Sequence, residues 1–240
     1  MDSPSDYHTL ETPNLVIEGV SVNHFYYKPD HPYSIETFEA INNWLKTNSL
    51  KIDGIPVNGF ERDSKGRLTA MPQVPLNKEV AVAQIVRQLA NWNSFSAHPG
   101  AVTSSQGGFL IGPGQIRAPD VAFTPSGICS VLTLQQRESF QGAPFSPTFV
   151  VEVDDLTTKL DELTSRIKDS FFPSGVRLAW LVDPVNKIFY DFKRTKDGVI
   201  RRCSHPWYKT NNQPAVMKGG NELPGFELEL SEINELYNVV

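Results

Sequence analysis

The sequence has few cysteines and no mark of secretion. Only Cys129 and Cys203 occur in 240 residues, and no Asn-x-Ser/Thr glycosylation sequon is present. Two such cysteines give no disulfide framework, and both are expected to behave as small buried side chains. The N-terminal segment lacks a basic start and an apolar core, and no run approaches the roughly 18 apolar residues of a membrane span. These absences predict a soluble, intracellular protein, without distinguishing cytoplasm from nucleus.

Two kinds of site are also missing from the sequence. Its histidines lack the spacing of zinc ligands: they are His8, His24, His31, His98 and His205. No Gly-x-x-x-x-Gly-Lys-Ser/Thr loop occurs, which argues against nucleotide hydrolysis of that type.

Basic charge is concentrated in one segment of an acidic chain. The net charge of −5 argues against coating nucleic acid by bulk electrostatics. The segment from Lys187 to Lys209, however, contains seven basic residues and two acidic ones. The aromatic residues Tyr190, Trp207 and Tyr208 lie in the same segment. Interleaved basic and aromatic residues are typical of phosphate-tracking surfaces with stacking groups. The segment predicts nucleic-acid contacts, and a solvated hairpin is the alternative. The predicted contact residues are Lys193, Arg194, Arg201 and Arg202.

Hydrophobic spacing predicts a mixture of helices and strands. We expect residues 1–32 to form a polar, partly disordered arm, and residues 33–240 to form one globular domain. Helices are expected over 35–46, from Asn77 to Trp92, near 132–140 within a loop over 124–147, and from 155 to just before Pro173. Strand pairs are expected around the turns at 63–66, 112–114 and 186–187, with the second pair carrying Asp120 into the sheet and the third following a buried strand over 176–182.

Two carboxylates occur with apolar runs that are predicted to be strands. Asp120 precedes Val121-Ala122-Phe123, and Glu152 lies within Phe149-Val150-Val151-Glu152-Val153. Strand side chains alternate between faces, so Glu152 shares a face with Val150, and Asp120 shares one with Ala122. If the two runs are neighbours in one sheet, the carboxylates can converge on a hard divalent cation such as Mg2+.

Several motifs follow one another in a recognisable order. They are Met71-Pro72, an Asn77-initiated helix with Glu79, Gly108-Phe109, Ala118-Pro119-Asp120-Val121-Ala122-Phe123, Phe149-Val150-Val151-Glu152-Val153, Leu163 with Arg166-Ile167, the run from Gly175 to Pro184, and Leu223-Pro224-Gly225-Phe226. This order resembles the Uma2 family of restriction-endonuclease-like proteins, within the PD-(D/E)xK nuclease superfamily. The resemblance extends over roughly residues 35–232.

The resemblance implies a fold and a metal site. The fold would be α/β (α+β), a restriction-endonuclease-like central mixed β-sheet flanked by helices, so that residues 33–240 form a Uma2-like nuclease-fold domain. Mg2+, or Mn2+ in its place, would be held by Asp120, Glu152 and the backbone carbonyl of Val153. The metal would activate water and stabilise charge at the scissile phosphate. Glu79 matches a glutamate of the first core helix that supports the metal.

One departure from the superfamily pattern concerns its lysine. The lysine two residues after the glutamate would fall at Asp154, and Asp154 and Asp155 are more typical of helix N-caps. Related chains place a lysine on the following helix, where this sequence has Arg166, which can stabilise charge but cannot accept a proton as a base. Lys159 lies two helical turns before Arg166 and shares its face, whereas Lys168 is expected to point to solvent. The helix is one residue longer than the family spacing near Phe171.

Two functions therefore stay open. The first is a Mg2+-dependent endonuclease, a hydrolase of DNA phosphodiester bonds, whose catalytic set would be Asp120, Glu152, Arg166, Lys159 and Glu79. The second is a catalytically degenerate nuclease-fold module that binds nucleic acid or a protein partner without cleavage. Both metal carboxylates favour the first, and the substituted lysine favours the second. The expected partner is nucleic acid, DNA first, with no membrane partner. A homodimer is expected if both strands are cut.

Overall fold

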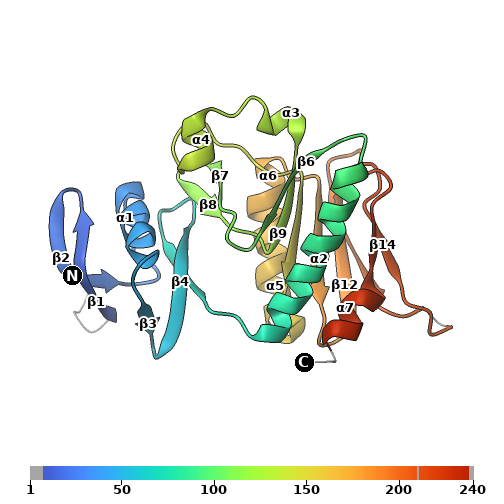
Figure 1. Ribbon diagram of the computed structural model, residues 1–240, viewed down its shortest axis with the longest axis horizontal. Coiled ribbons are helices and arrows are strands. Elements are labelled where there is room, and N and C mark those ends of the chain that lie inside the picture. Colours follow the sequence, from blue (N-terminus) through green and yellow to red (C-terminus); the bar gives the residue numbers. More distant parts are fainter. Residues whose placement is uncertain (1–7, 210, 238–240) are drawn as a thin grey trace. The chain divides into compact units, whose positions relative to one another are not determined.

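The computed structural model describes residues 8–209 and 211–237, with side chains up to Ile233 in the last helix. The chain forms two compact units, which we describe separately (Figure 1). Of the described residues, unit 1 contains those up to Val74 together with Leu110–Arg117, and unit 2 contains Pro75–Phe109 and those from Ala118 onward. Helices and strands are interspersed in a mixed α+β architecture, as predicted. No helix among the described residues has the length and apolar content needed to cross a membrane.

Unit 1 is built from short antiparallel strands and one helix. Strands β1 (His8–Ile17) and β2 (Val20–Tyr27) pair with each other. A second sheet has the order β3-β4-β8-β7, with β5 also pairing with β4. Its strands are β3 (Leu50–Ile52), β4 (Ile55–Arg62), β5 (Leu68–Pro72), β7 (Phe109–Gly112) and β8 (Gln115–Arg117). Helix α1 (Ile35–Leu45) begins at Ser34, whose hydroxyl accepts the Thr37 N–H at 3.0 Å, as the sequence predicted.

The N-terminal arm differs from the prediction. Residues 8–27 form an ordered hairpin instead of a partly disordered arm, and residues 1–7 lie outside the described residues. Leu10 and Leu15 of β1 are buried, so the hairpin has an apolar side. Glu18 and Gly19 both have positive φ, 51° and 79°, as a tight two-residue hairpin turn requires. Glu-Gly lacks the usual Asn-Gly or Asp-Gly signature, so the turn was missed. The predicted division at residues 32 and 33 stays a prediction.

Unit 2 is organised around a six-stranded mixed sheet of order β13-β12-β11-β10-β9-β6. Only the β10–β11 pair is parallel among the pairings in this sheet's described strands. The strands are β6 (Gly100–Ser104), β9 (Val121–Pro125), β10 (Phe149–Val153), β11 (Leu178–Asp183), β12 (Ile188–Arg194) and β13 (Ile200–Pro206), and a small sheet pairs β14 (Val216–Lys218) with β15 (Glu227–Glu229). The helical segments are α2 (Leu76–Phe95), α3 (Ser126–Cys129), α4 (Leu134–Glu138), α5 (Leu156–Arg166), η2 (Ile167–Phe171), α6 (Phe172–Ser174) and α7 (Leu230–Tyr237).

The two faces of this sheet have different neighbours. Helix α2 buries Val82, Ile85 and Leu89 in one apolar cluster with odd-numbered residues of β9 and β10, such as Phe123 and Val151. Side chains alternate along a strand, so the even-numbered residues of β10, and Asp120 just before β9, face the opposite way. The two carboxylates are thereby kept out of the α2 core.

Three predicted elements need correction. Helix α2 begins at Leu76 after Pro75, which makes no side-chain cap, so Asn77 is inside the helix and does not start it. The β7–β8 hairpin forms as predicted, but it belongs to a sheet of unit 1. It therefore does not carry Asp120 into the sheet, because Asp120 precedes β9 of the six-stranded sheet of unit 2. The helix after Asp155 continues past the expected stop, because Pro173 lies in the first turn of α6, where its missing N–H is tolerated.

Candidate active site

Asp120 and Glu152 meet because β9 and β10 are adjacent antiparallel strands, as the sequence prediction required. Val151 pairs with Val121, so continuing the register by one residue sets Glu152 opposite Asp120. Side chains opposite each other on one face lie about 4.5–5.5 Å apart at Cβ. Both residues are buried, with 8% of Asp120 and 5% of Glu152 exposed. Two carboxylates this close and this buried need compensating charge.

Asp120 receives compensation at a single oxygen. Its Oδ2 accepts the backbone N–H of Val153 at 2.8 Å and lies 3.2 Å from Nζ of Lys78. Pro119 has no N–H, so β9 pairing ends there, and the Asp120 side chain takes the place of a backbone partner of β10. Burial raises the pKa of Asp120 above its ordinary value, although Lys78, the Val153 N–H and Arg166 each lower it part of the way.

Lys78, in the first turn of α2, is the site residue that sequence reasoning missed. Its Nζ contacts Asp120 and also lies 3.5 Å from Oδ2 of Asp154. Burial lowers the pKa of Lys78, but the carboxylates of Asp120, Asp154 and Glu152 outweigh it and raise the pKa above its ordinary value. The ammonium therefore stays charged at neutral pH. The signal was present in the sequence, because Lys78 lies four and seven residues before Val82 and Ile85, on the buried stripe of the helix.

Glu79 is placed differently from its neighbour Lys78. Sequence reasoning set it near the buried side because it precedes Ala83 and Val86 by about one turn. The structure exposes both Glu79 and Ala83. A step of one residue turns the helix by about 100°, which separates Glu79 from the side that carries Lys78. The structure thus does not bring Glu79 to the carboxylates, and its supporting role stays a prediction without a contact behind it.

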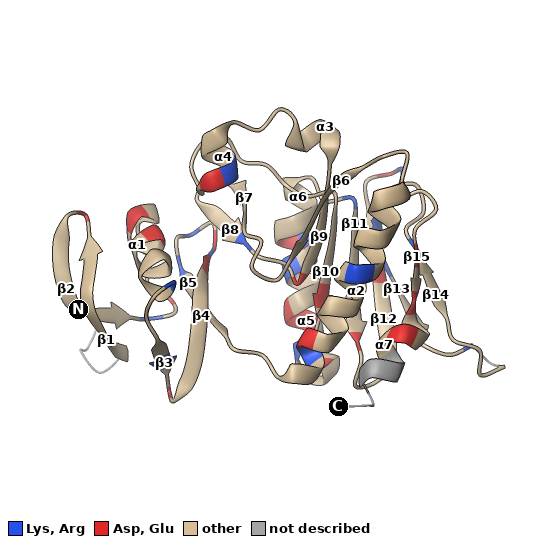
Figure 2. Ribbon diagram, viewed as in Figure 1, with Lys and Arg blue, Asp and Glu red and all other residues tan. Residues whose placement is uncertain are grey.

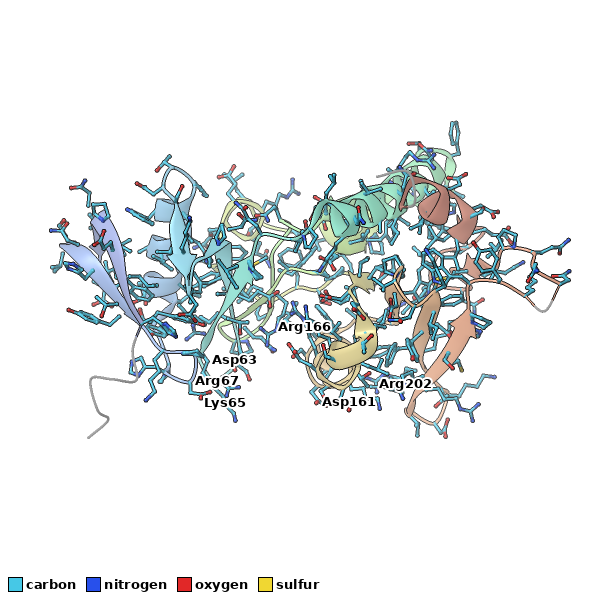
Figure 3. The ribbon with its side chains drawn as sticks, turned by 90° about the horizontal axis from the view of Figure 1, so that it is seen from below. Asp63, Lys65, Arg67, Asp161, Arg166 and Arg202 are labelled. Atoms are coloured by element: carbon cyan, nitrogen blue, oxygen red, sulfur yellow. The ribbon has the colours of Figure 1, made fainter. Side chains whose placement is uncertain are left out.

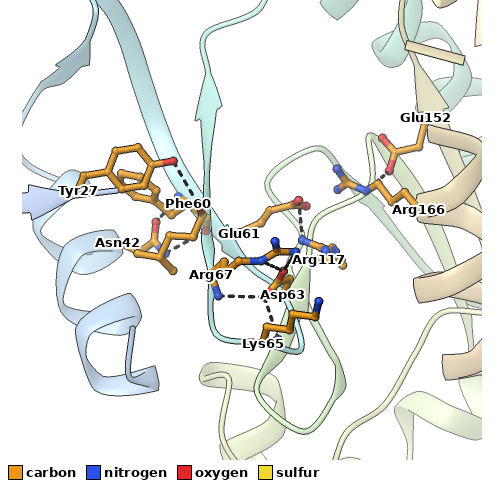
Figure 4. Close-up of polar contacts among 11 residues, drawn as sticks. Tyr27, Asn42, Phe60, Glu61, Asp63, Lys65, Arg67, Arg117, Glu152 and Arg166 are labelled. Carbon is orange, nitrogen blue, oxygen red and sulfur yellow. Dashed lines mark hydrogen bonds and ion pairs between the residues drawn. The ribbon is translucent and has the colours of Figure 1, made fainter. Parts of the chain in front are cut away.

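Arg166 pairs with Glu152 at the last residue of α5. Its Nε lies 3.2 Å from Oε1 of Glu152, and both side chains are largely buried (Figure 4). A five-residue π-helical turn, η2, follows at once. Such turns accommodate a single extra residue inside a helix and are frequent at functional sites. The extra helical residue noted in the sequence is therefore taken up directly after Arg166, which leaves Arg166 on the α-helical side, facing Glu152.

Asp154 binds two lysines instead of acting as a helix cap. Its Oδ2 lies 2.9 Å from Nζ of Lys159 as well as near Lys78. The N-cap of α5 is Asp155, which accepts the Thr157 N–H at 3.0 Å. The Thr157 hydroxyl and N–H lower the pKa of Asp155. Lys159 is half exposed, and Lys168 is exposed as predicted.

These ion pairs, together with the register that sets Glu152 opposite Asp120, define one group of charges, which we call the charge cluster. It consists of three carboxylates and three cations, which lie on α2, β10 and α5, just before β9 and just after β10 (Figure 2 colours the charged residues). Its members are Asp120, Glu152, Asp154, Lys78, Lys159 and Arg166.

The four predicted nucleic-acid contacts do not form one surface. In the β12–β13 register, Lys193 pairs with Arg201 and Phe192 with Arg202. Directly opposed residues share a face, so Lys193 and Arg201 lie on one side of the sheet, and Arg194 and Arg202 lie on the other. Arg202 donates to the Thr164 hydroxyl of α5 at 3.1 Å. Figure 3 labels Arg202 together with Asp161 and Arg166 of the same helix. The prediction of contact with nucleic acid stays open for each residue, but the four do not lie on one face of the sheet.

The sequence matches the model of one protein family. The Uma2 model, described as "Putative restriction endonuclease", matches residues 58–231. The chain belongs to the Uma2 family. A solved structure entitled as a "putative nuclease belonging to DUF820" from Anabaena variabilis ATCC 29413 is similar to this Uma2 chain. It has a TM-score of 0.54 and 11% identity, and the match covers 75% of this chain and 91% of that one. At that identity the likeness shows the restriction-endonuclease-like fold alone. No curated protein matched.

The donors in this Uma2 site fit a hard divalent cation. Asp120 and Glu152 supply carboxylate oxygens, the ligand type that Mg2+ prefers. The N–H and C=O of a strand residue point to the same neighbouring strand, so the Val153 carbonyl faces the side from which Asp120 accepts the Val153 N–H. No three Asp, Glu, His or Cys side chains among the described residues form a metal-binding group by themselves. The fit thus depends on two carboxylates and a carbonyl, with further positions left to water and substrate.

Proposed function

We propose that the protein is a Mg2+-dependent endonuclease that hydrolyses DNA phosphodiester bonds. The observation that carries the proposal is the pair Asp120 and Glu152, which are buried on one sheet face and opposite each other in register. Burying two carboxylates together is costly, and a bound divalent cation would offset that cost. Membership of a family described as restriction endonucleases supports the same chemistry.

In this proposal each residue has a distinct task. Asp120, Glu152 and the Val153 carbonyl hold Mg2+, or Mn2+ in its place, and the metal supplies Lewis acidity at the scissile phosphate and an activated water. The Val153 N–H fixes one oxygen of Asp120 and so orients the carboxylate. Arg166 keeps its charge at every working pH, so it stabilises negative charge developing on the phosphate but accepts no proton. Lys159, half exposed beside Asp154, attracts the DNA backbone.

One observation favours the second function, a nuclease-fold module that binds nucleic acid or a protein partner without cutting. The charge cluster holds three carboxylates and three cations, so it is formally neutral without metal. A site that balances its own charge does not require a metal for folding. A homodimer, which cutting both strands would call for, stays a prediction.

Cleavage assays separate the two functions. Purified wild type would be incubated with supercoiled and single-stranded DNA and Mg2+ or Mn2+, beside Asp120→Asn and Glu152→Gln. Matched controls are Asp161→Asn and Glu162→Gln, which change exposed carboxylates of α5 in the same way. The proposal expects metal-dependent nicking by wild type and both controls, and a loss of at least about 100-fold in the two site variants. Wild type that cuts neither substrate with either metal, and binds no metal in a titration, would overturn it.

A further inference from the structure

The residue two positions after Glu152 has the wrong charge for the superfamily pattern. Asp154 stands where the resemblance leads one to expect a lysine, and it faces the same side of β10 as Glu152. A carboxylate there adds negative charge beside two metal carboxylates and beside the phosphate of a substrate. Some other feature of the site must offset this charge.

Helix α2 supplies that charge. We propose that Lys78 is a catalytic residue of this site, whose ammonium group donates to the scissile phosphate, and that Asp154 is the positioning residue that holds Lys78 there. The inference rests on the proposed endonuclease function and deepens it. In this proposal α2, and not the strand, provides the lysine, and Asp154 binds it.

The contacts distinguish Lys78 from the other lysine at Asp154. Lys78 touches both Asp120 and Asp154, at 3.2 Å and 3.5 Å, and its side chain is 20% exposed. Lys159 touches Asp154, and its side chain is 50% exposed. An ammonium group has three donors on one nitrogen, so it can bond two carboxylates and still donate to a phosphate oxygen. Of these two lysines, Lys78 is the one placed against a metal carboxylate.

The second carboxylate explains how Lys78 stays in place when a metal binds. Mg2+ at Asp120 would compete with the ammonium group for the same carboxylate, because both are cations. An ammonium group held by Asp120 alone would then be released into solvent. Asp154 provides an anchor that the proposed metal does not use. The backbone anchor is the buried stripe of α2, which packs through Val82 and Ile85 into the core.

The first test is single-turnover DNA cleavage with Mg2+, in parallel with calorimetric titration of Mg2+. Lys78→Met is expected to slow cleavage about 100-fold while still binding Mg2+, because one donor to the reacting phosphate is lost. Asp154→Asn is expected to slow it about 10-fold. The double variant Lys78→Met with Asp154→Lys returns an ammonium group to the strand, and is expected to recover at least 10-fold over Lys78→Met. Lys168→Met, an exposed lysine just past Arg166, is the matched control and keeps wild-type activity.

The second test measures the position of Lys78 without using activity. Acetic anhydride labelling read by mass spectrometry should modify Lys78 more slowly than Lys168 in the metal-free wild type, and faster in Asp154→Asn. If Lys78→Met fails to fold, this labelling still tests the proposal, because it uses only wild type and Asp154→Asn. The side chain of Asp154 is partly exposed, so the fold is expected to tolerate this change.

The outcomes separate the two proposals. An active wild type whose Lys78→Met variant cuts equally fast would overturn the role of Lys78 alone. Labelling of Lys78 that does not change in Asp154→Asn would overturn the positioning role. A wild type that cuts no DNA with any metal would overturn the endonuclease function, and the catalytic role of Lys78 with it.

Discussion

Asp183, the last residue of β11, binds the start of α5 and the turn that leads into β12. Its Oδ1 accepts the N–H groups of Val185 and Asn186, at 3.0 Å and 2.8 Å. Its Oδ2 accepts the Leu156 N–H at 3.0 Å and the Asn186 amide at 2.8 Å. The carboxylate is 2% exposed. One buried side chain therefore fixes the start of α5 and the turn into β12.

Replacing Asp183 with Asn should destabilise the protein strongly. An amide has one oxygen, so it can satisfy one pair of these donors while its NH2 group faces the other pair. Two hydrogen bonds to a charged acceptor are lost, and two donors that are buried or partly buried are left facing a donor. At about 1.5–2 kcal/mol for each such bond, the free energy of unfolding should fall by roughly 3–4 kcal/mol.

Urea denaturation of wild type, Asp183→Asn and Asp161→Asn measures this difference. The signal is tryptophan fluorescence, to which Trp180 and Trp207, both buried in unit 2, contribute. Asp161 is exposed on α5, so its variant should stay within about 0.5 kcal/mol of wild type. Equal free energies of unfolding for the two variants would refute the idea that Asp183 organises this end of the sheet.

Two further changes test other parts of the structure. In unit 1, burial raises the pKa of Asp63, but the Arg67 N–H and guanidinium and the Lys65 N–H outweigh it and lower the pKa below its ordinary value (Figure 4). A lowered folded-state pKa stabilises the folded protein above the unfolded pKa of about 3.9, and this stability is lost as pH falls through the folded pKa. In Asp63→Asn the free energy of unfolding should therefore fall less steeply with decreasing pH than in wild type. The same acid dependence in both proteins would contradict this. In unit 2, a Cβ at Gly100 would overlap the Thr124 carbonyl oxygen and come within 2.7 Å of the Phe123 ring. Gly100→Ala should therefore lower the free energy of unfolding, measured by thermal denaturation, by about 1–3 kcal/mol. The control Gly127→Ala, whose added Cβ would have nothing within 4 Å, should change it little.

The sequence was most informative where periodicity and register act locally. Alternation along β9 and β10 put Asp120 and Glu152 on faces that the structure brings together, and the Ser34 cap was read correctly from residue type. It was least informative where a long side chain crosses between elements. Lys78 and Asp154 are 76 residues apart, and no local pattern joins them. Glu79 was chosen because it matches a glutamate of the resembled family, and its role stays a prediction, whereas Lys78, one residue earlier, lies on the buried stripe of the helix and contacts Asp120.

The basic residues of β12 and β13 lie on two faces of the sheet for a different reason. A count of charges along the sequence ignores that neighbouring strand residues point to opposite faces. Arg202 binds Thr164, and Lys193 lies 2.8 Å from Asp191, so these charges also serve contacts within unit 2. Composition alone cannot distinguish basic residues that bind other residues of the protein from basic residues that are available to bind phosphate.

The balance of charge in the cluster would give the proposed metal a second role, in attracting DNA. Three carboxylates and three cations leave the metal-free cluster formally neutral, with little attraction for a phosphodiester. A bound Mg2+ would raise the net charge of the cluster by two, so that the site would attract the DNA phosphate that binds beside the metal. An endonuclease of this design should bind DNA at the site more tightly with metal than without it, whereas a binding module should show the same affinity in both conditions. Ca2+, which offers the same charge and similar ligand preferences, allows the comparison while slowing turnover. An affinity that Ca2+ leaves unchanged in wild type, as in Asp120→Asn, would favour the module over the enzyme.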